Sequence, residues 1–93
     1  MFRIIDGRAT GKTNRLLLLA KEYNGIIICS NPEMLKDRAE RLGLTDIEFI
    51  SYRDSLRSGK IDDKKPIFID ELEMYIKYCF AQANICGYTL SEE

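Results

Sequence analysis

Short apolar runs alternate along the chain with stretches in which apolar residues recur every three or four positions. Residues 25–29 form a continuous apolar run, which is typical of a strand buried on both faces. Similar short runs lie between polar or turn-forming residues and predict further strands at residues 2–5, 47–50, 66–69 and 85–90.

The stretches between these runs have helical spacing. They predict helices at residues 12–23, 32–42 and 71–83, and a short helix at 52–57. Strands that alternate with helices favour βαβ units and a parallel sheet covered on both sides. We therefore predict an α/β fold, a three-layer α/β/α sandwich around a five-stranded, mainly parallel sheet. The length of 93 residues predicts a single domain over residues 1–93.

Composition narrows the function classes. The formal net charge of −1 indicates no overall basic surface for nucleic acid, which leaves only a local patch open. No apolar run approaches the ~20 residues of a membrane span, so we expect no membrane association. The chain has no histidine, which excludes imidazole catalysis, and its three unpaired cysteines indicate buried thiols in a reducing cytoplasm. The basic side chains expected to be solvated surface are Arg38, Arg41, Arg53, Arg57, Lys60, Lys64 and Lys65.

A glycine-containing segment, Asp6–Thr13, joins the first predicted strand to the first predicted helix. It ends in Gly11-Lys12-Thr13, as does the phosphate-binding P-loop pattern Gly-x-x-x-x-Gly-Lys-Ser/Thr. Backbone N–H groups at a helix N-terminus attract phosphate, Lys12 supplies a positive charge, and the Thr13 hydroxyl can ligate Mg²⁺. The predicted phosphate-binding residues are Gly7, Arg8, Ala9, Thr10, Gly11, Lys12 and Thr13.

The segment departs from this pattern at its first glycine position. Asp6 stands there, and glycine follows one residue later as Gly7. Either Asp6 adopts the required conformation, which aspartate does better than most residues, or Gly7 replaces it and the loop is reshaped. An ordinary glycine-containing turn at a helix start is the simpler alternative.

A second pair of polar residues, Asp70-Glu71, directly follows the apolar run at residues 66–69. An aspartate at the carboxyl end of such a strand can hold Mg²⁺, directly or through water. A glutamate beside it can orient and deprotonate an attacking water. Alternatively, Asp70 caps the next helix and Glu71 complements its dipole. The catalytic candidates are thus Lys12 and Glu71, with Thr13 and Asp70 as metal ligands.

The last predicted strand offers hydroxyl groups at its end. Thr89, or second Ser91, could sense the γ-phosphate of a bound nucleotide from that position. Thr89 is therefore the third catalytic candidate.

The residues Gly11-Lys12-Thr13 and Ile69-Asp70-Glu71 together resemble the Walker A and Walker B motifs of P-loop NTPases of the RecA-like branch. Residues 51–71 also resemble part of the first motor domain of superfamily 1 and 2 helicases. The whole chain is similar to small P-loop proteins of unassigned function from phages and prophages of Gram-positive bacteria. The resemblance implies a minimal P-loop NTPase core, with the strand at 85–90 beside those at 2–5 and 66–69, and the other two outward.

This resemblance implies Mg²⁺-dependent binding of a nucleoside triphosphate such as ATP, with slow or partner-dependent hydrolysis. The chain is shorter than a helicase motor and has no obvious arginine finger, so a second copy or a protein partner is expected to complete the site. A phage origin implies the host cytoplasm. The main alternative is a non-enzymatic regulatory module of a phage or mobile element that binds a host protein or nucleic acid. A small-molecule kinase resembling thymidine kinase is a third reading, which the missing lid and acceptor segments disfavour.

Overall fold

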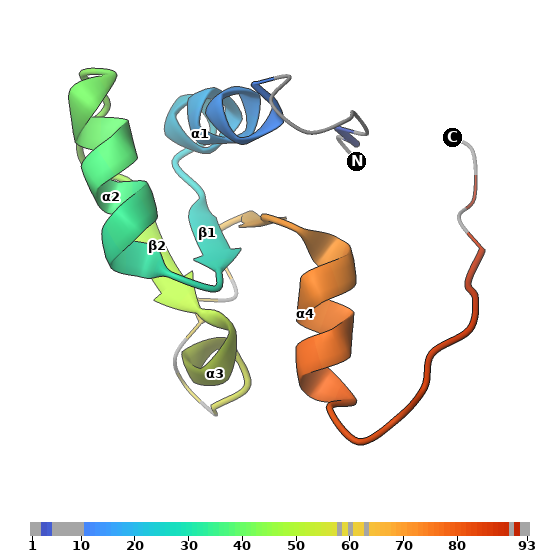
Figure 1. Cartoon of the computed structure of the whole chain (residues 1–93). Coiled ribbons are helices and arrows are strands. Elements are labelled where there is room, and N and C mark those ends of the chain that lie inside the picture. Colours follow the sequence, from blue (N-terminus) through green and yellow to red (C-terminus); the bar gives the residue numbers. More distant parts are fainter. Residues whose placement is uncertain are drawn as a thin grey trace.

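A computed structural model describes residues 3–4, 11–57, 59, 61–62, 64–89 and 91 (Figure 1). Helices and strands alternate along most of this part of the chain. The elements are helices α1 (Lys12–Glu22), α2 (Pro32–Arg41), α3 (Tyr52–Ser55) and α4 (Leu72–Cys79), and strands β1 (Ile26–Cys29), β2 (Glu48–Ser51) and β3 (Ile67–Ile69).

The three strands form one parallel sheet in the order β2-β1-β3. Ile26 pairs with Glu48 on one side and with Ile67 on the other, so all three strands start at the same level. This confirms the prediction of a small α/β fold with a parallel sheet. It also places β1 and β2 on the same side of β3, which fits the expected outward position of those two strands.

The core lies between the sheet and the first two helices. Leu17 and Ala20 of α1, with Leu35 and Ala39 of α2, pack with side chains of β1 and β3. All four residues of β1 are buried, as its continuous apolar run predicted. Burial on both faces and pairing on both edges make β1 the centre of the fold.

Local sequence explains where α2 begins and ends. The Asn31 side chain accepts a hydrogen bond from the Met34 N–H at 3.2 Å, and Pro32 occupies the first turn. Gly43 follows the helix with a φ of 76°, a left-handed conformation that glycine adopts without strain. Both features agree with the prediction for this helix.

Two of the five expected strands do not appear in the described residues. Residues 84–89 have no regular secondary structure, and Figure 1 shows this segment leading away from α4 as an extended tail. Arg3 and Ile4 are not in a strand, and the rest of 2–5 lies outside the described residues, as does Leu90. The five-stranded sheet is therefore not shown by the described residues, because a strand forms only with a hydrogen-bonded neighbour and an apolar run does not reveal one.

Helix α4 also differs from its prediction. It ends at Cys79 instead of residue 83, and none of its residues is fully buried. Leu72 and Cys79 belong to the apolar spacing that predicted this helix, yet both are exposed. No described helix is long and apolar enough to cross a membrane.

Gly25 is the position at which the fold should be most sensitive to one added methyl group. A Cβ atom there would lie 2.5 Å from Cε2 of Phe68 and 2.9 Å from the Pro66 carbonyl oxygen. We expect Gly25→Ala to lower the free energy of unfolding by about 1–3 kcal/mol, measured by chemical denaturation. Gly87→Ala is the control, since a Cβ there meets nothing within 4 Å. Equal denaturation midpoints for the two variants would contradict this account.

Candidate functional site

Residues from the two predicted motifs meet at the carboxyl end of the sheet. The Thr13 hydroxyl donates a hydrogen bond to Oδ1 of Asp70 at 3.3 Å, across 57 positions of sequence. Thr13 lies in the first turn of α1, and Asp70 directly follows β3. Ligands of open parallel α/β sheets bind outside the carboxyl ends of the strands, which is where this pair lies.

The N-terminus of α1 presents backbone donors at this point. Gly11 precedes the helix with a φ of 80° and provides no side chain to cap it. The helical hydrogen bonds begin with the Arg15 N–H, which donates to the Gly11 carbonyl oxygen at 3.0 Å. The N–H groups of Lys12, Thr13 and Asn14 thus have no acceptor within the helix, which favours an anion at this end.

Lys12 and Glu71 form an ion pair between the two motifs. Nζ of Lys12 lies 3.3 Å from Oε1 of Glu71, and the two side chains are 28% and 44% exposed. Solvent screens a pair this exposed, so its contribution to stability is small. Its importance is geometric, because it directly joins two of the three predicted catalytic side chains.

Asp70 lies in a perturbed electrostatic environment. Burial, followed by the charge of Glu71, raises the pKa of the Asp70 carboxyl above its usual value. The Thr13 hydrogen bond and the charges of Lys12 and Arg38 act in the opposite direction and lower this pKa. The net rise means that burial and the Glu71 charge outweigh these stabilising contacts, and a divalent cation beside the carboxylate would lower its pKa.

Tyr52 holds the backbone on which both acids are carried. Its side chain is 5% exposed, and its hydroxyl donates to the carbonyl oxygens of Asp70 at 2.7 Å and of Glu71 at 3.2 Å. Glu71 has a φ of 56° and a ψ of 66°, a left-handed conformation that is unfavourable for a glutamate. The Tyr52 ring contacts that of Tyr75 edge-on, with centroids 5.1 Å apart, so α3 and α4 meet beneath the site.

Burial and the neighbouring Asp70 charge raise the pKa of Tyr52 to about 12, so the hydroxyl keeps its proton at neutral pH. The sequence carries no signal for this role of Tyr52. The Ser51 hydroxyl caps α3 by accepting from the Asp54 N–H at 3.0 Å. This cap explains where α3 begins but does not indicate that the Tyr52 side chain reaches Asp70 and Glu71.

The alternative reading of Asp70 as a helix cap does not fit the structure. The residue at the cap of α4 is Glu71, and no side chain caps this helix by a hydrogen bond. The Asp70 carboxylate instead accepts from Thr13, while the Asp70 N–H donates to the Ile28 carbonyl oxygen at 2.9 Å. Asp70 therefore continues the sheet and points to α1.

Several predicted residues are not brought to this site. Thr89 and Ser91 lie in the exposed tail and not at the end of a strand. Tyr88 ties this tail to α4, because its hydroxyl donates to Oε1 of Glu73 at 2.6 Å. The P-loop residues that lie outside the described part of the chain are Asp6, Gly7, Arg8, Ala9 and Thr10.

Thr13 and Asp70 could together offer two oxygen ligands to Mg²⁺. The described residues contain no cluster of three or more cysteine, aspartate or glutamate side chains suited to a metal ion. Mg²⁺ takes about six oxygen ligands and usually receives most of them from phosphates and water. The pair therefore fits a metal that arrives with a phosphate better than one held by the protein alone.

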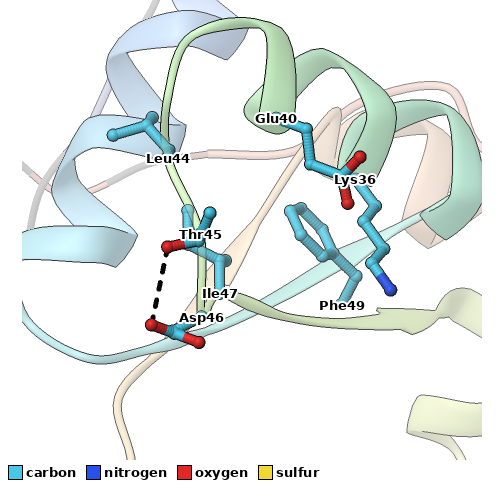
Figure 2. Close-up of a pocket in the computed structure, with 7 residues that line it drawn as sticks. All are labelled: Lys36, Glu40, Leu44, Thr45, Asp46, Ile47 and Phe49. Atoms are coloured by element: carbon cyan, nitrogen blue, oxygen red, sulfur yellow. Dashed lines mark hydrogen bonds between the residues drawn. The ribbon is translucent and has the colours of Figure 1, made fainter.

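A small cavity lies elsewhere, between α2 and the segment that leads into β2 (Figure 2). Its volume is about 70 Å³, well below the roughly 300–1,000 Å³ of typical ligand pockets. Its lining residues are Lys36, Glu40, Leu44, Thr45, Asp46, Ile47 and Phe49. Several of these precede β2, so the cavity lies toward the amino ends of the strands and away from Thr13 and Asp70.

The chain matches no protein family, no curated protein sequence and no solved structure in comparisons with each. The functional argument therefore depends on the geometry of the site.

Replacing Asp70 should show how much the buried carboxylate charge lowers the stability of the fold. Since its pKa is raised in the folded protein, the fold binds more protons than the unfolded chain, and stability falls as pH rises through the Asp70 titration. Asp70→Asn removes this charge and keeps an oxygen that can accept from Thr13. We expect a higher melting temperature than wild type at neutral pH, with the difference shrinking in acid. A melting temperature that is lower at neutral pH would contradict this.

Removing the Tyr52 hydroxyl should weaken the link between α3 and the two acids. Tyr52→Phe leaves two carbonyl oxygens without this donor, and we expect a loss of about 1–2 kcal/mol in the free energy of unfolding. Tyr78→Phe is the control, because the Tyr78 ring also contacts the Tyr52 ring but no hydrogen bond of its hydroxyl is seen. Chemical denaturation measures both, and an equal loss in both variants would show that the hydroxyl of Tyr52 is not special.

Proposed function

We propose that this protein binds a nucleoside triphosphate, ATP in the first instance, together with Mg²⁺ at the carboxyl end of its sheet. The observation that supports this best is the hydrogen bond between Thr13 and Asp70. It joins a hydroxyl at a helix N-terminus to a carboxylate at a strand end, and both groups are oxygen ligands suited to Mg²⁺.

In this proposal each side chain has a separate task. The N-terminus of α1 and Lys12 bind the phosphates, together with residues 7–10, which precede Gly11. Thr13 and Asp70 hold Mg²⁺, which would neutralise phosphate charge. Glu71 orients an attacking water, so slow or partner-dependent hydrolysis is part of the proposal.

In this proposal, the ion pair between Lys12 and Glu71 must break before hydrolysis can occur. While Lys12 pairs with Glu71, that carboxylate is held by a cation and is not free to accept a proton. Phosphate oxygens compete for Lys12, and a bound nucleotide would release Glu71.

The proposal extends to the fold as a minimal P-loop NTPase core of the RecA-like branch. In the described sheet β3 pairs with β1 alone and is an edge strand. A five-stranded, three-layer arrangement would add residues 85–90 and 2–5 beyond this edge, which would bring Thr89 to the site. A cytoplasmic location, a phage origin and a second copy or partner that completes the site belong to the same proposal.

A second candidate, a non-enzymatic interaction module, is favoured by exposed apolar side chains. These are Leu72, Met74, Tyr78, Phe80 and Tyr88 on α4 and the tail that follows it. Such a group of side chains fits a protein partner better than solvent. A Lys12→Ala variant that keeps its biological activity would favour this module over the nucleotide-binding protein.

Melting curves with Mg²⁺-ATP test the proposal. A ligand at a hundred times its Kd stabilises the fold by about 2.7 kcal/mol, so we expect the wild-type melting temperature to rise by several degrees. Lys12→Ala should abolish most of this rise, and EDTA should reduce it. Lys36→Ala is the control, because it removes the same charge at an exposed position of α2. No rise for wild type at millimolar Mg²⁺-ATP would contradict the proposal.

A further inference from the structure

Arg38 of α2 reaches the first turn of α1, next to the candidate site. Its Nε–H donates a hydrogen bond to Oδ1 of Asn14 at 2.8 Å. Asn14 directly follows Thr13, whose hydroxyl contacts Asp70. The guanidinium group thus lies beside the first turn of α1, where the backbone N–H groups lack helical acceptors.

The charge of Arg38 is not neutralised by a neighbour in the described part of the chain. Arg41, one turn further along α2, pairs with Asp37 at 2.8 Å, and Arg57 lies 3.8 Å from Asp54. Arg38 has no such carboxylate within 4.0 Å among the described residues, and Asn14 is its one hydrogen-bond partner there. Its charge nevertheless reaches Asp70, whose pKa it lowers.

The geometry of this guanidinium suits a phosphate. Binding of Nε to Asn14 leaves the two Nη groups free of protein acceptors in the described residues. A planar pair of N–H donors matches two phosphate oxygens, and arginine is the side chain best adapted to such bidentate contacts. Because Asn14 already orients the guanidinium, less side-chain freedom is lost when an anion binds.

We propose that Arg38 is a phosphate-binding residue of this site, with its Nη groups donating to phosphate oxygens of the nucleoside triphosphate at the N-terminus of α1. Asn14 is its positioning residue and need not touch the ligand. This inference rests on the proposed nucleotide-binding function. It adds to the site a cationic side chain from α2, which lies outside the P-loop pattern. This cation comes from the same chain and not from a partner.

A purely structural role for Arg38 makes a different prediction. If the bond between Arg38 and Asn14 only joined α1 to α2, its loss would lower stability and leave the affinity of the folded protein for ligand unchanged. A phosphate-binding role lowers affinity by a factor that depends on ionic strength, because salt screens the attraction between an exposed guanidinium and phosphate.

Titration calorimetry of the full chain with Mg²⁺-ATP separates the two roles. We expect Arg38→Ala to raise Kd about tenfold or more, since it removes charged hydrogen bonds. Arg41→Ala is the matched control on the same helix and should stay within about twofold of wild type, because Arg41 already has Asp37. Arg38→Lys should recover part of the affinity, because it keeps the charge without the bidentate geometry.

Two further variants test the positioning by Asn14. Arg38→Gln has an amide that can still donate to Asn14 but no charge, and it should bind as weakly as Arg38→Ala while remaining folded. Asn14→Ala should raise Kd by less than Arg38→Ala does, and the two changes together should be no worse than Arg38→Ala alone.

The results distinguish this inference from the function on which it rests. One possible result is that wild type, Arg41→Ala, Arg38→Ala and Arg38→Gln all bind Mg²⁺-ATP equally well. This result would overturn the role of Arg38 but not the proposed nucleotide site. A wild-type protein that binds no Mg²⁺-ATP would overturn both. A difference between Arg38→Ala and wild type that shrinks as salt rises is the result we expect.

Discussion

The arrangement of the whole molecule depends on the buried central strand β1. Its four residues are inaccessible to solvent, and it pairs in parallel with β2 on one edge and with β3 on the other. The pairing continues one residue beyond β3, where the Asp70 N–H donates to the Ile28 carbonyl oxygen. Because α1 packs on the same core, this strand determines that the first turn of α1 meets Asp70.

The site that results is electrostatically incomplete. Two neighbouring carboxylates, Asp70 and Glu71, share Lys12, and the Asp70 pKa remains raised. Glu71 also has an unfavourable left-handed backbone conformation. Its carbonyl oxygen accepts a hydrogen bond from the Tyr52 hydroxyl. A fold selected for stability alone would have no reason to keep adjacent charges and strain at one point, and such features concentrate at functional sites. A divalent cation bound with a phosphate would add positive charge beside the two carboxylates.

Much of this could be predicted from the sequence, because the elements concerned have local causes. The run at residues 25–29 is apolar without interruption, and Asn31-Pro32 starts a helix by its own chemistry. Alternation of strands and helices was enough to predict a parallel sheet, and a parallel sheet was enough to predict that Thr13 and Asp70 lie at one edge. The parallel sheet is confirmed and Thr13 does contact Asp70, whereas the phosphate and metal roles remain predictions.

What could not be predicted depends on contacts between distant residues. Tyr52 reaches Asp70 across 18 positions, and Arg38 reaches Asn14 across 24, so each contact joins two different elements and no local pattern announces it. Arg38 was expected to be solvated surface; it is exposed, and its Nε nevertheless has a specific acceptor. The predicted strand at residues 85–89 is not shown for the same reason. Its apolar residues resemble a strand, but strand formation depends on a hydrogen-bonded neighbour.

The central claim is that one site at the carboxyl end of the sheet binds a nucleotide together with its metal ion. Paramagnetic broadening of amide NMR signals by Mn²⁺-ATP, with Mg²⁺-ATP as the diamagnetic reference, tests it most directly. The account predicts strong, localised broadening at Thr13, Asn14 and Asp70, with Thr45 and Asp46 beside the small cavity unaffected. Broadening centred on Thr45 and Asp46, or none beyond that of free Mn²⁺, would contradict it.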